Sequence, residues 1–370
     1  MDIFPVIIAT GKAFCDRVHE RKQLKEYIKY GRHTVVIAAR RYGKTSLINQ
    51  TLLELQLPYT IMELTLAVSL ADIEKLIIKH IGYLLNSILP KTTKAKQNVL
   101  KLFKSLNPEL ALTVGGEQLT FRLMQNKSSS TENISEILKR LDDTAVLINQ
   151  RVVIVMDEFQ QISNIQNHTL EAAIRHAMQY SKQVSYIFSG SNRHMLQDMF
   201  NSKNRPFYHS CEIMKLDRIS RNDYEDFIQK AAKEKWKKPL PDAVIEEIFC
   251  LSEFHSNYIN RICGYFWILN EFPTIEKIRK SWDNFIQSKR TEFTEDILRL
   301  SKNQRKVLAY LSQKPTTHPS HQEVCNELEL SESSVRQAVR KLMLMDYIYK
   351  NKEGMIGILD PAFRDFIKNL

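Results

Sequence analysis

The sequence predicts an α/β domain on a parallel sheet, followed by a helical region and a small C-terminal unit. Five short runs rich in β-branched residues, separated by helical patterns, occupy the first 217 residues, and strand signals then fade. Glycine is scarce, at 10 of 370 residues, which disfavours hairpins and tight turns and favours a helix-rich chain. At about 150 residues per domain, the length suits two or three domains.

The predicted strands are mostly apolar without alternation, which is typical of parallel strands covered on both faces. They are residues 34–39, 59–64, 152–156, 184–189 and 212–216. The helical patterns between them are residues 46–55, 70–89, 133–149 and 170–181. This alternation predicts a doubly wound α/β domain with a five-stranded parallel sheet. Residues 110–123 alternate around Gly115 and Gly116, and predict a β-hairpin insert within about 95–131.

Composition and charge exclude several classes of protein. Hydrophobic residues make up 43% and charged residues 26%, near the globular average, so the chain is neither disordered nor fibrous. The net charge of +11 permits a nucleic acid or an acidic lipid surface as partner without requiring one. Five cysteines without CxxC spacing predict ordinary thiols rather than a zinc site. With no membrane-length apolar run and no basic signal-peptide start, we expect a soluble cytoplasmic protein without a membrane partner.

A phosphate-binding motif follows the first predicted strand. Residues 34–48 form an apolar run, a loop and a Gly-Lys-Thr triplet that opens a helix, the context that a P-loop requires. Gly43 lets the backbone approach phosphate, Lys44 reaches the β- and γ-phosphates, and the Thr45 hydroxyl binds Mg²⁺. Ala38 replaces the first glycine of the pattern, at a cost of about 1 kcal/mol only if its φ is positive. The predicted nucleotide-binding residues here are Ala38, Ala39, Arg40, Arg41, Tyr42, Gly43, Lys44, Thr45 and Ser46.

Acidic and polar residues end two further strands. Asp157 and Glu158 follow the apolar run 152–156, at the strand edge where α/β sheets bind ligands. We expect Asp157 to hold Mg²⁺ and Glu158 to act as the general base, with Lys44 as a second catalytic residue. The next strand ends in the polar segment Ser189-Gly190-Ser191-Asn192, which is predicted to sense the γ-phosphate, with Ser189 as its candidate binding residue; a plain turn is the alternative.

The order of these motifs resembles the archaeal-type ATPases of the STAND class, relatives of AAA+ proteins. The resembling segments are Phe14-Cys15-Asp16-Arg17, residues 38–47, Phe103 to Pro108, Asp157-Glu158-Phe159-Gln160, Ser189-Gly190-Ser191 and Asp360-Pro361-Ala362-Phe363-Arg364. The resemblance implies an ATP-driven switch and adds Arg17 to the nucleotide-binding residues. Where the family has Tyr-Gly-Arg, this chain has Tyr208-His209-Ser210, and Arg205 is a candidate replacement for the missing arginine.

The C-terminal residues predict a winged helix. Helical patterns cover residues 301–312, 319–328 and 332–345, and a hairpin pattern covers 347–359. The third helix has an outer face with Arg336, Arg340 and Lys341, which is suited to double-stranded DNA, although winged helices also dock proteins. The predicted domains are a P-loop ATPase domain (1–217), a helical lid (218–295) and the winged helix (296–370).

Three functions are consistent with these features. The favoured one is a Mg²⁺-dependent ATPase that binds ATP and ADP and works as a nucleotide-controlled switch, on or near DNA. The alternatives are a DNA-binding regulator and a protein-assembly switch, each binding ATP with little turnover. The protein client and the oligomeric state stay open.

Overall fold

The computed structural model describes residues 2–89, 110–115, 118–123, 130–165 and 168–370. Contacts divide the chain into two compact units. The sheet unit comprises residues 17–40 and 44–217, and the helical unit comprises residues 1–16, 41–43 and 218–370. Residues 1–16, which the sequence analysis assigned to the first domain, therefore belong by their contacts to the helical unit.

Five parallel strands form the centre of the sheet unit, in the order β2-β5-β6-β1-β7. They are β1 (Thr34–Ile37), β2 (Tyr59–Glu63), β5 (Val152–Asp157), β6 (Val184–Gly190) and β7 (Glu212–Lys215). Each predicted strand is thereby confirmed. Because β6 lies between β1 and β5, the carboxyl ends of these three strands adjoin.

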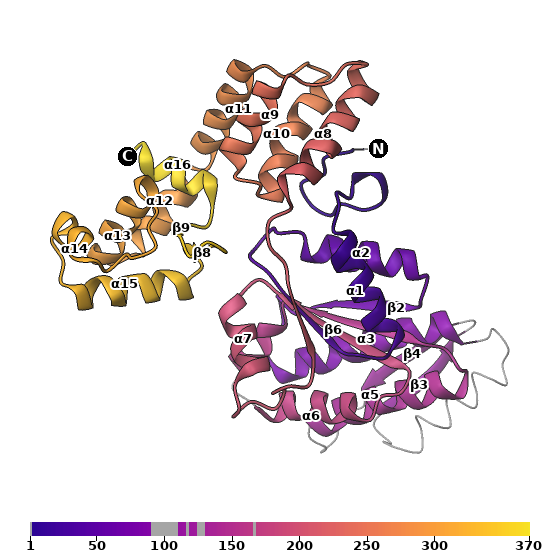
Figure 1. The fold of residues 1–370 in the computed structure, drawn as a ribbon. Helices are drawn as coiled ribbons and strands as arrows, with labels where there is room; N and C mark the ends of the chain where they lie inside the picture. The colour runs from indigo at the N-terminus through magenta and orange to yellow at the C-terminus, as the bar shows by residue number, and fades with distance from the viewer. Residues whose placement is uncertain (1, 90–109, 116–117, 124–129, 166–167) are drawn as a thin grey trace. The chain divides into compact units, whose positions relative to one another are not determined.

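Helices cover both faces of this sheet, which explains why every residue of β1 and β6 is buried. The helices are α1 (Val18–Lys29), α2 (Lys44–Leu55), α3 (Leu70–Ile88), α5 (Ser130–Leu147), α6 (His168–Gln179) and α7 (Arg193–Asn201), with the 3₁₀ helix η2 (Phe159–Ile165) after β5. One core joins alternate residues of β1, β5 and β6 to α3, α5, α6 and α7. Helices α1 and α2 lie on the opposite side (Figure 1).

The predicted hairpin insert is present in the described residues. Strands β3 (Leu110–Gly115) and β4 (Gln118–Leu123) pair antiparallel, with Gly115 opposite Gln118. Most of the remaining predicted insert, including the segment Phe103 to Pro108, lies outside the described residues.

The helical unit contains two sets of elements. The first is α8 (Arg221–Trp236), α9 (Asp242–Ser252), α10 (Ser256–Leu269), α11 (Ile275–Ser288) and α12 (Arg290–Leu298). The second is α13 (Lys302–Gln313), α14 (Gln322–Leu328), α15 (Glu332–Leu344), the strands β8 (Ile348–Lys350) and β9 (Ile356–Ile358), and α16 (Pro361–Lys368). Three helices followed by an antiparallel hairpin are the elements of a winged helix. Ser331 caps α15, because its side chain accepts the Ser334 N–H.

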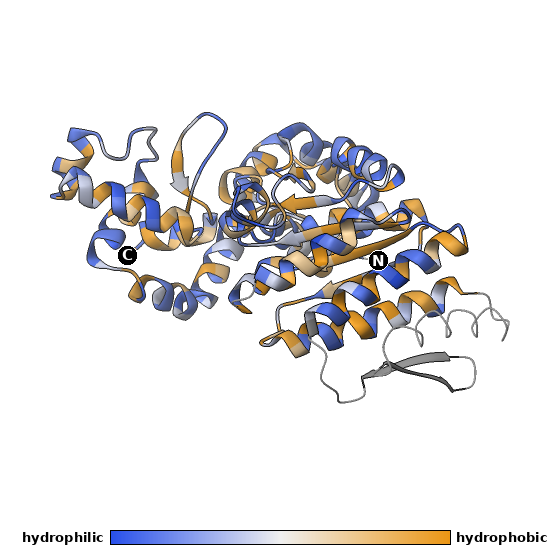
Figure 2. Cartoon of the chain, turned by 90° about the horizontal axis from the view of Figure 1, so that it is seen from below, coloured by the Kyte–Doolittle hydropathy of each residue, from blue (hydrophilic) through white to orange (hydrophobic). Residues whose placement is uncertain are grey.

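One hydrophobic core runs through this unit, from Phe4 near the N-terminus to Ile367 in α16. Figure 2 shows its basis: the helices carry hydrophobic and hydrophilic residues on different faces, whereas the strands of the sheet unit are largely hydrophobic. Within the described residues, no helix combines the length and apolar character needed to cross a membrane.

Candidate nucleotide site

The loop between β1 and α2 has the backbone conformations that a phosphate-binding loop needs. Gly43 has φ +84°, and a Cβ placed on it would meet no atom within 4 Å, so its backbone is open to approach. Ala38 is not among the residues with positive φ, so the alanine fits without strain. The left-handed residue of this loop, apart from Gly43, is Arg41, with φ +65°.

Lys44 begins α2 and is only 6% exposed. Its ammonium donates to the carbonyl oxygens of Ala38 and Ala39, at 3.4 Å each. Both distances are long for a hydrogen bond to a cation, so these carbonyls compensate its burial weakly. The lysine is therefore held against the loop whose backbone would contact phosphate.

Thr45 and Asp157 meet across the sheet edge, although 112 positions separate them in the sequence. The Thr45 hydroxyl donates to Asp157 Oδ2 at 3.3 Å. The other carboxylate oxygen accepts the Ser189 hydroxyl at 2.6 Å and the Glu158 N–H at 3.0 Å. Ser189 thus orients Asp157, a contact that the sequence analysis did not foresee; its predicted role as a phosphate sensor stays a prediction.

Hydroxyl and carboxylate oxygens are the ligand types that Mg²⁺ prefers, and this ion usually keeps several waters and substrate oxygens. Thr45 and Asp157 fit that donor set. Within the residues that the structure describes, no cluster of three or more His, Cys, Asp or Glu side chains could hold a metal ion by itself. A magnesium site here would therefore depend on the nucleotide for further ligands.

Glu158 follows Asp157 and has φ +53°, a left-handed conformation that is uncommon for a non-glycine residue. Its Oε2 accepts the Gln160 amide at 2.6 Å, the Ser191 hydroxyl at 2.8 Å and the Ser191 N–H at 3.2 Å. Burial raises the pKa of Glu158, but these hydrogen bonds and the nearby Lys44 outweigh burial and leave the pKa below its ordinary value. The carboxylate is therefore ionised at neutral pH.

We call this group the strand-edge cluster; its members are Thr45, Asp157, Glu158, Gln160, Ser189 and Ser191. The sequence predicted roles for Thr45, Asp157, Glu158 and Ser189, included Ser191 in the predicted γ-phosphate-sensing strand end, and gave no role to Gln160. Gln160 lies inside a 3₁₀ helix that the strand pattern does not predict. Gln160 and Ser191 both belong to segments that resemble family motifs. This resemblance is the feature of the sequence that could have marked them as site residues.

Other predicted nucleotide-binding residues have partners of their own. Arg17 is 5% exposed, pairs with Glu20 at 2.9 Å and donates to the Asp217 carbonyl oxygen. The Tyr42 ring packs on His255, with centroids 5.0 Å apart, so its backbone is the part left for a nucleotide. Arg40 and Arg41 are exposed and Ser46 is buried. The assignment of all these residues to nucleotide binding stays a prediction.

Arg205 is poorly suited to replace the missing family arginine. Its guanidinium pairs with the buried Glu171 at 3.0 Å and donates to the Ser163 hydroxyl at 2.7 Å. A second carboxylate, that of Asp198, lies 3.7 Å from the guanidinium. These contacts tie Arg205 to η2, α6 and α7 and explain it as a structural residue.

The helical unit holds a second polar group, the arginine–carboxylate cluster, made of Arg218, Glu253, Tyr258, Asp360 and Arg364. Glu253 pairs with Arg218 at 2.9 Å and also with Arg364. Asp360 accepts the Tyr258 hydroxyl at 2.7 Å and caps α16 through the N–H groups of Ala362 and Phe363. The Asp360 to Arg364 segment therefore fastens α16 to the C-terminal end of α9 and to α10.

Arg218 makes further contacts within the same unit. It donates to the Tyr42 hydroxyl at 3.0 Å and to the carbonyl oxygens of Glu253 at 2.7 Å and Leu359 at 3.1 Å. Its guanidinium also lies over the Tyr349 ring, 5.0 Å from the centroid. One side chain thus links the phosphate-loop residue Tyr42 to the predicted lid and to the hairpin of the predicted winged helix.

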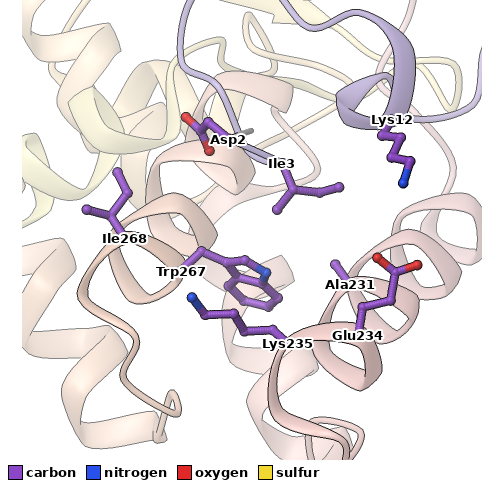
Figure 3. Close-up of a pocket in the computed structure, with 8 residues that line it drawn as sticks. All are labelled: Asp2, Ile3, Lys12, Ala231, Glu234, Lys235, Trp267 and Ile268. Atoms are coloured by element: carbon purple, nitrogen blue, oxygen red, sulfur yellow. The ribbon is translucent and has the colours of Figure 1, made fainter.

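A cavity of about 570 Å³ lies between the N-terminal segment, α8 and α10 of the helical unit (Figure 3). Trp267 forms part of its wall, with Lys12, Lys235, Asp2 and Glu234 around it. None of the predicted site residues lines it. Because its two lysines face two acids, the cavity favours no single charge of ligand.

Comparisons with known proteins bear on the fold. A Walker-type ATPase of Pyrococcus abyssi has a similar structure, with a TM-score of 0.70 and 16% sequence identity. The similarity covers 99% of this chain and 99% of the Pyrococcus chain. The ORC2 protein of Aeropyrum pernix, in complexes with ADPNP and ADP, matches 99% of this chain over 96% of its own, with a TM-score of 0.55 and 12% identity. No protein-family model and no curated protein matches the sequence. The fold is that of a P-loop NTPase with a C-terminal helical region.

Proposed function

We propose that this protein is a Mg²⁺-dependent ATPase whose nucleotide state controls the helical unit, in the manner of the STAND ATPases that its motifs resemble. One observation carries the proposal. The Thr45 hydroxyl, the Asp157 carboxylate and the Glu158 carboxylate gather at the carboxyl ends of adjoining parallel strands, behind a P-loop. The Pyrococcus structure, a Walker-type ATPase, and the nucleotide-bound Aeropyrum structure have the same fold and support it.

Each residue of this arrangement has a task in phosphoryl transfer. The backbone from Ala38 to Gly43 and the N-terminus of α2 cradle phosphate oxygens, and Lys44 offsets their charge. Thr45 and Asp157 would hold Mg²⁺, which would supply positive charge to offset the negative charge that develops during phosphoryl transfer. Glu158, ionised and adjacent, accepts a proton from the attacking water. Arg17 joins the site through the family resemblance.

Replacing Lys44 with alanine tests nucleotide binding. The variant loses the cation next to the phosphates, and hydrogen bonds to charged groups contribute about 1.5 to 3 kcal/mol, so ATP affinity should fall tenfold or more. Isothermal titration calorimetry measures the change, and Lys75→Ala, which removes an exposed lysine of α3, is the matched control. Equal ATP affinity of the Lys44→Ala variant and the wild type would contradict the proposal.

The output of the switch is proposed to be the winged helix, residues 296–370, carried by the lid, residues 218–295. Helix α15 buries Val335, Ala338, Val339 and Leu342 and exposes Arg336, Arg340 and Lys341. Exposed cations on the third helix favour contact with duplex DNA. Arg336 also pairs with Glu332 one turn earlier, so the helix itself offsets part of this charge. Docking of a client protein on this face is the alternative.

Salt dependence distinguishes these two partners. Each neutralised phosphate of duplex DNA releases about 0.9 counterion, so Arg336→Ala with Arg340→Ala should flatten the log–log salt slope by about two units. Filter binding at several salt concentrations measures this slope. A loss confined to one DNA sequence would indicate that an arginine reads a guanine edge. Absence of duplex binding at about 50 mM salt, with and without ATP, would contradict DNA contact and favour the docking role.

A further inference from the structure

We propose that Gln160 and Ser191 are positioning residues that anchor one carboxylate oxygen of Glu158 and leave the other oxygen for the attacking water. The inference rests on the proposed function, because it assigns partners to the proposed general base. Neither residue is expected to touch the nucleotide. Both act through Glu158, which distinguishes them from the predicted catalytic residues.

The contacts of the Glu158 carboxylate are strongly one-sided. All three of its hydrogen bonds, from the Gln160 amide at 2.6 Å and from the Ser191 hydroxyl and N–H at 2.8 and 3.2 Å, end on Oε2. Within the described parts of the chain, Oε1 has no such donor and Glu158 forms no ion pair. A glutamate otherwise has several rotamers, and fixing one oxygen removes most of this freedom before the reaction.

The Gln160 amide is itself confined to its place. The side chain is 5% exposed, and its Oε1 atom lies 1.9 Å from where a Cβ on Gly190 would stand. No real side chain fits at that distance, so Gly190 provides the space in which the amide sits. Gly190 has no positive φ and does not need glycine for its backbone. Its lack of a side chain is explained by Gln160.

The three elements involved are adjacent. Glu158 directly follows β5, and Gln160 lies in the following η2. Gly190 ends β6, which pairs with β5, and Ser191 directly follows β6. The anchor thus spans two neighbouring strand ends, and the pairing of β5 with β6 fixes its dimensions. A side chain held by rigid elements is positioned more closely than one held within a flexible loop.

Four variants test the anchor through ATP turnover. Gln160→Ala and Ser191→Ala each remove a donor, and Gly190→Ala displaces the amide without deleting it. Each should lower kcat at least tenfold, while KM for ATP and calorimetric affinity for ADP change less than twofold. Ser191→Thr keeps a hydroxyl and should restore most of kcat. Gln161→Ala, which changes the next glutamine along η2, is the matched control.

If Gln160 and Ser191 act by positioning Glu158, the loss of kcat in these variants should depend on the Glu158 carboxylate. In a Glu158→Gln background the same variants should change kcat by less than twofold. Wild-type kcat in the Gln160→Ala and Gly190→Ala variants would overturn the proposal, and so would a full further loss in the Glu158→Gln background.

Thermal unfolding of the nucleotide-free protein gives a readout independent of turnover. Gln160→Ala should lower the Tm of the otherwise wild-type protein. In a Glu158→Ala background the same substitution should lower Tm by less than half of that amount. Equal losses in both backgrounds would overturn the anchor. Wild-type protein without turnover, combined with coupled Tm values, would instead refute the proposed ATPase and leave the contact itself intact.

Discussion

The strand-edge cluster and the arginine–carboxylate cluster both contain partly buried carboxylates, but they balance the negative charge differently. Glu253 is paired with two arginines, and Asp360 accepts a phenol and two N–H groups at a helix start. Asp157 and Glu158 accept from hydroxyl, amide and backbone N–H groups, and neither forms an ion pair with another described residue. The two arginines therefore neutralise Glu253, whereas Asp157 and Glu158, like Asp360, are held by neutral donors.

This difference distinguishes contacts that hold the fold together, as in the arginine–carboxylate cluster, from a candidate binding site, as in the strand-edge cluster. Carboxylates that are oriented by neutral donors remain available to a cation, because a hydrogen bond from a hydroxyl or amide does not cancel their charge. Carboxylates already paired with arginine gain little from a further cation. The same residue types thus serve attachment of α16 in one unit and, by our proposal, magnesium and water in the other.

The largest expected effect is on the strand-edge cluster. Replacing Glu158 with glutamine keeps the shape and the hydrogen-bonding partners but removes the base, so kcat should fall by about 10² to 10⁴-fold with ATP affinity retained. Steady-state ATPase assays and calorimetry measure the two quantities. Glu253→Gln, the equivalent change in the arginine–carboxylate cluster, is the control and should keep kcat within about threefold. A fully active Glu158→Gln protein would refute the role of Glu158 and erase the contrast between the clusters.

A smaller effect is expected next to the arginine–carboxylate cluster, at His255. This side chain is 4% exposed, and burial, with Arg218 and Arg41, lowers its pKa to about 3. In the unfolded chain the pKa of His255 has its ordinary value near 6.5. As the pH falls, the unfolded chain therefore binds a proton at His255 before the folded protein does. The stability contributed by neutral His255 is complete above about pH 6.5 and is lost progressively toward pH 3, by at most about 1.4 kcal/mol per pH unit.

Urea unfolding of wild type and His255→Phe at pH 7 and pH 5 measures this effect. Phenylalanine keeps an aromatic ring against Tyr42 and Tyr258 but does not titrate. The variant should lose less stability than the wild type between the two pH values. Burial raises the pKa of Asp360, and that opposing contribution is common to both proteins. Identical pH dependence of the two proteins would show that His255 does not titrate as the structure implies.

The five strands of the sheet unit and the position of the phosphate loop followed from the sequence, because both depend on local patterns. Apolar runs set the strands, and Gly43 with Lys44 and Thr45 marks the start of α2. Contacts between distant segments did not follow. The Thr45–Asp157 bond joins residues 112 positions apart, and the Ser191 bonds to Glu158 join residues 33 apart.

The arginine–carboxylate cluster was equally invisible to local patterns. Arg218 has partners in four separate segments of the chain, and no periodicity connects them. No local pattern assigns residues 1–16 to the helical unit either, because Phe4 is one apolar residue in a short loop. Its packing on Trp267, with ring centroids 4.7 Å apart, depends on the tertiary fold.

That packing has a consequence for synthesis on the ribosome. The Asn260 amide donates to the Pro5 carbonyl oxygen, a bond between residues 255 positions apart, and Asn257 makes a similar bond to Val6. Phe4 therefore leaves the ribosome long before its partners in α10 are made. The sheet unit, which is in effect an insertion in the chain of the helical unit, can fold in between. The helical unit closes last, and a nascent chain stalled before α10 has Phe227 of α8 available to Phe4 but lacks Trp267.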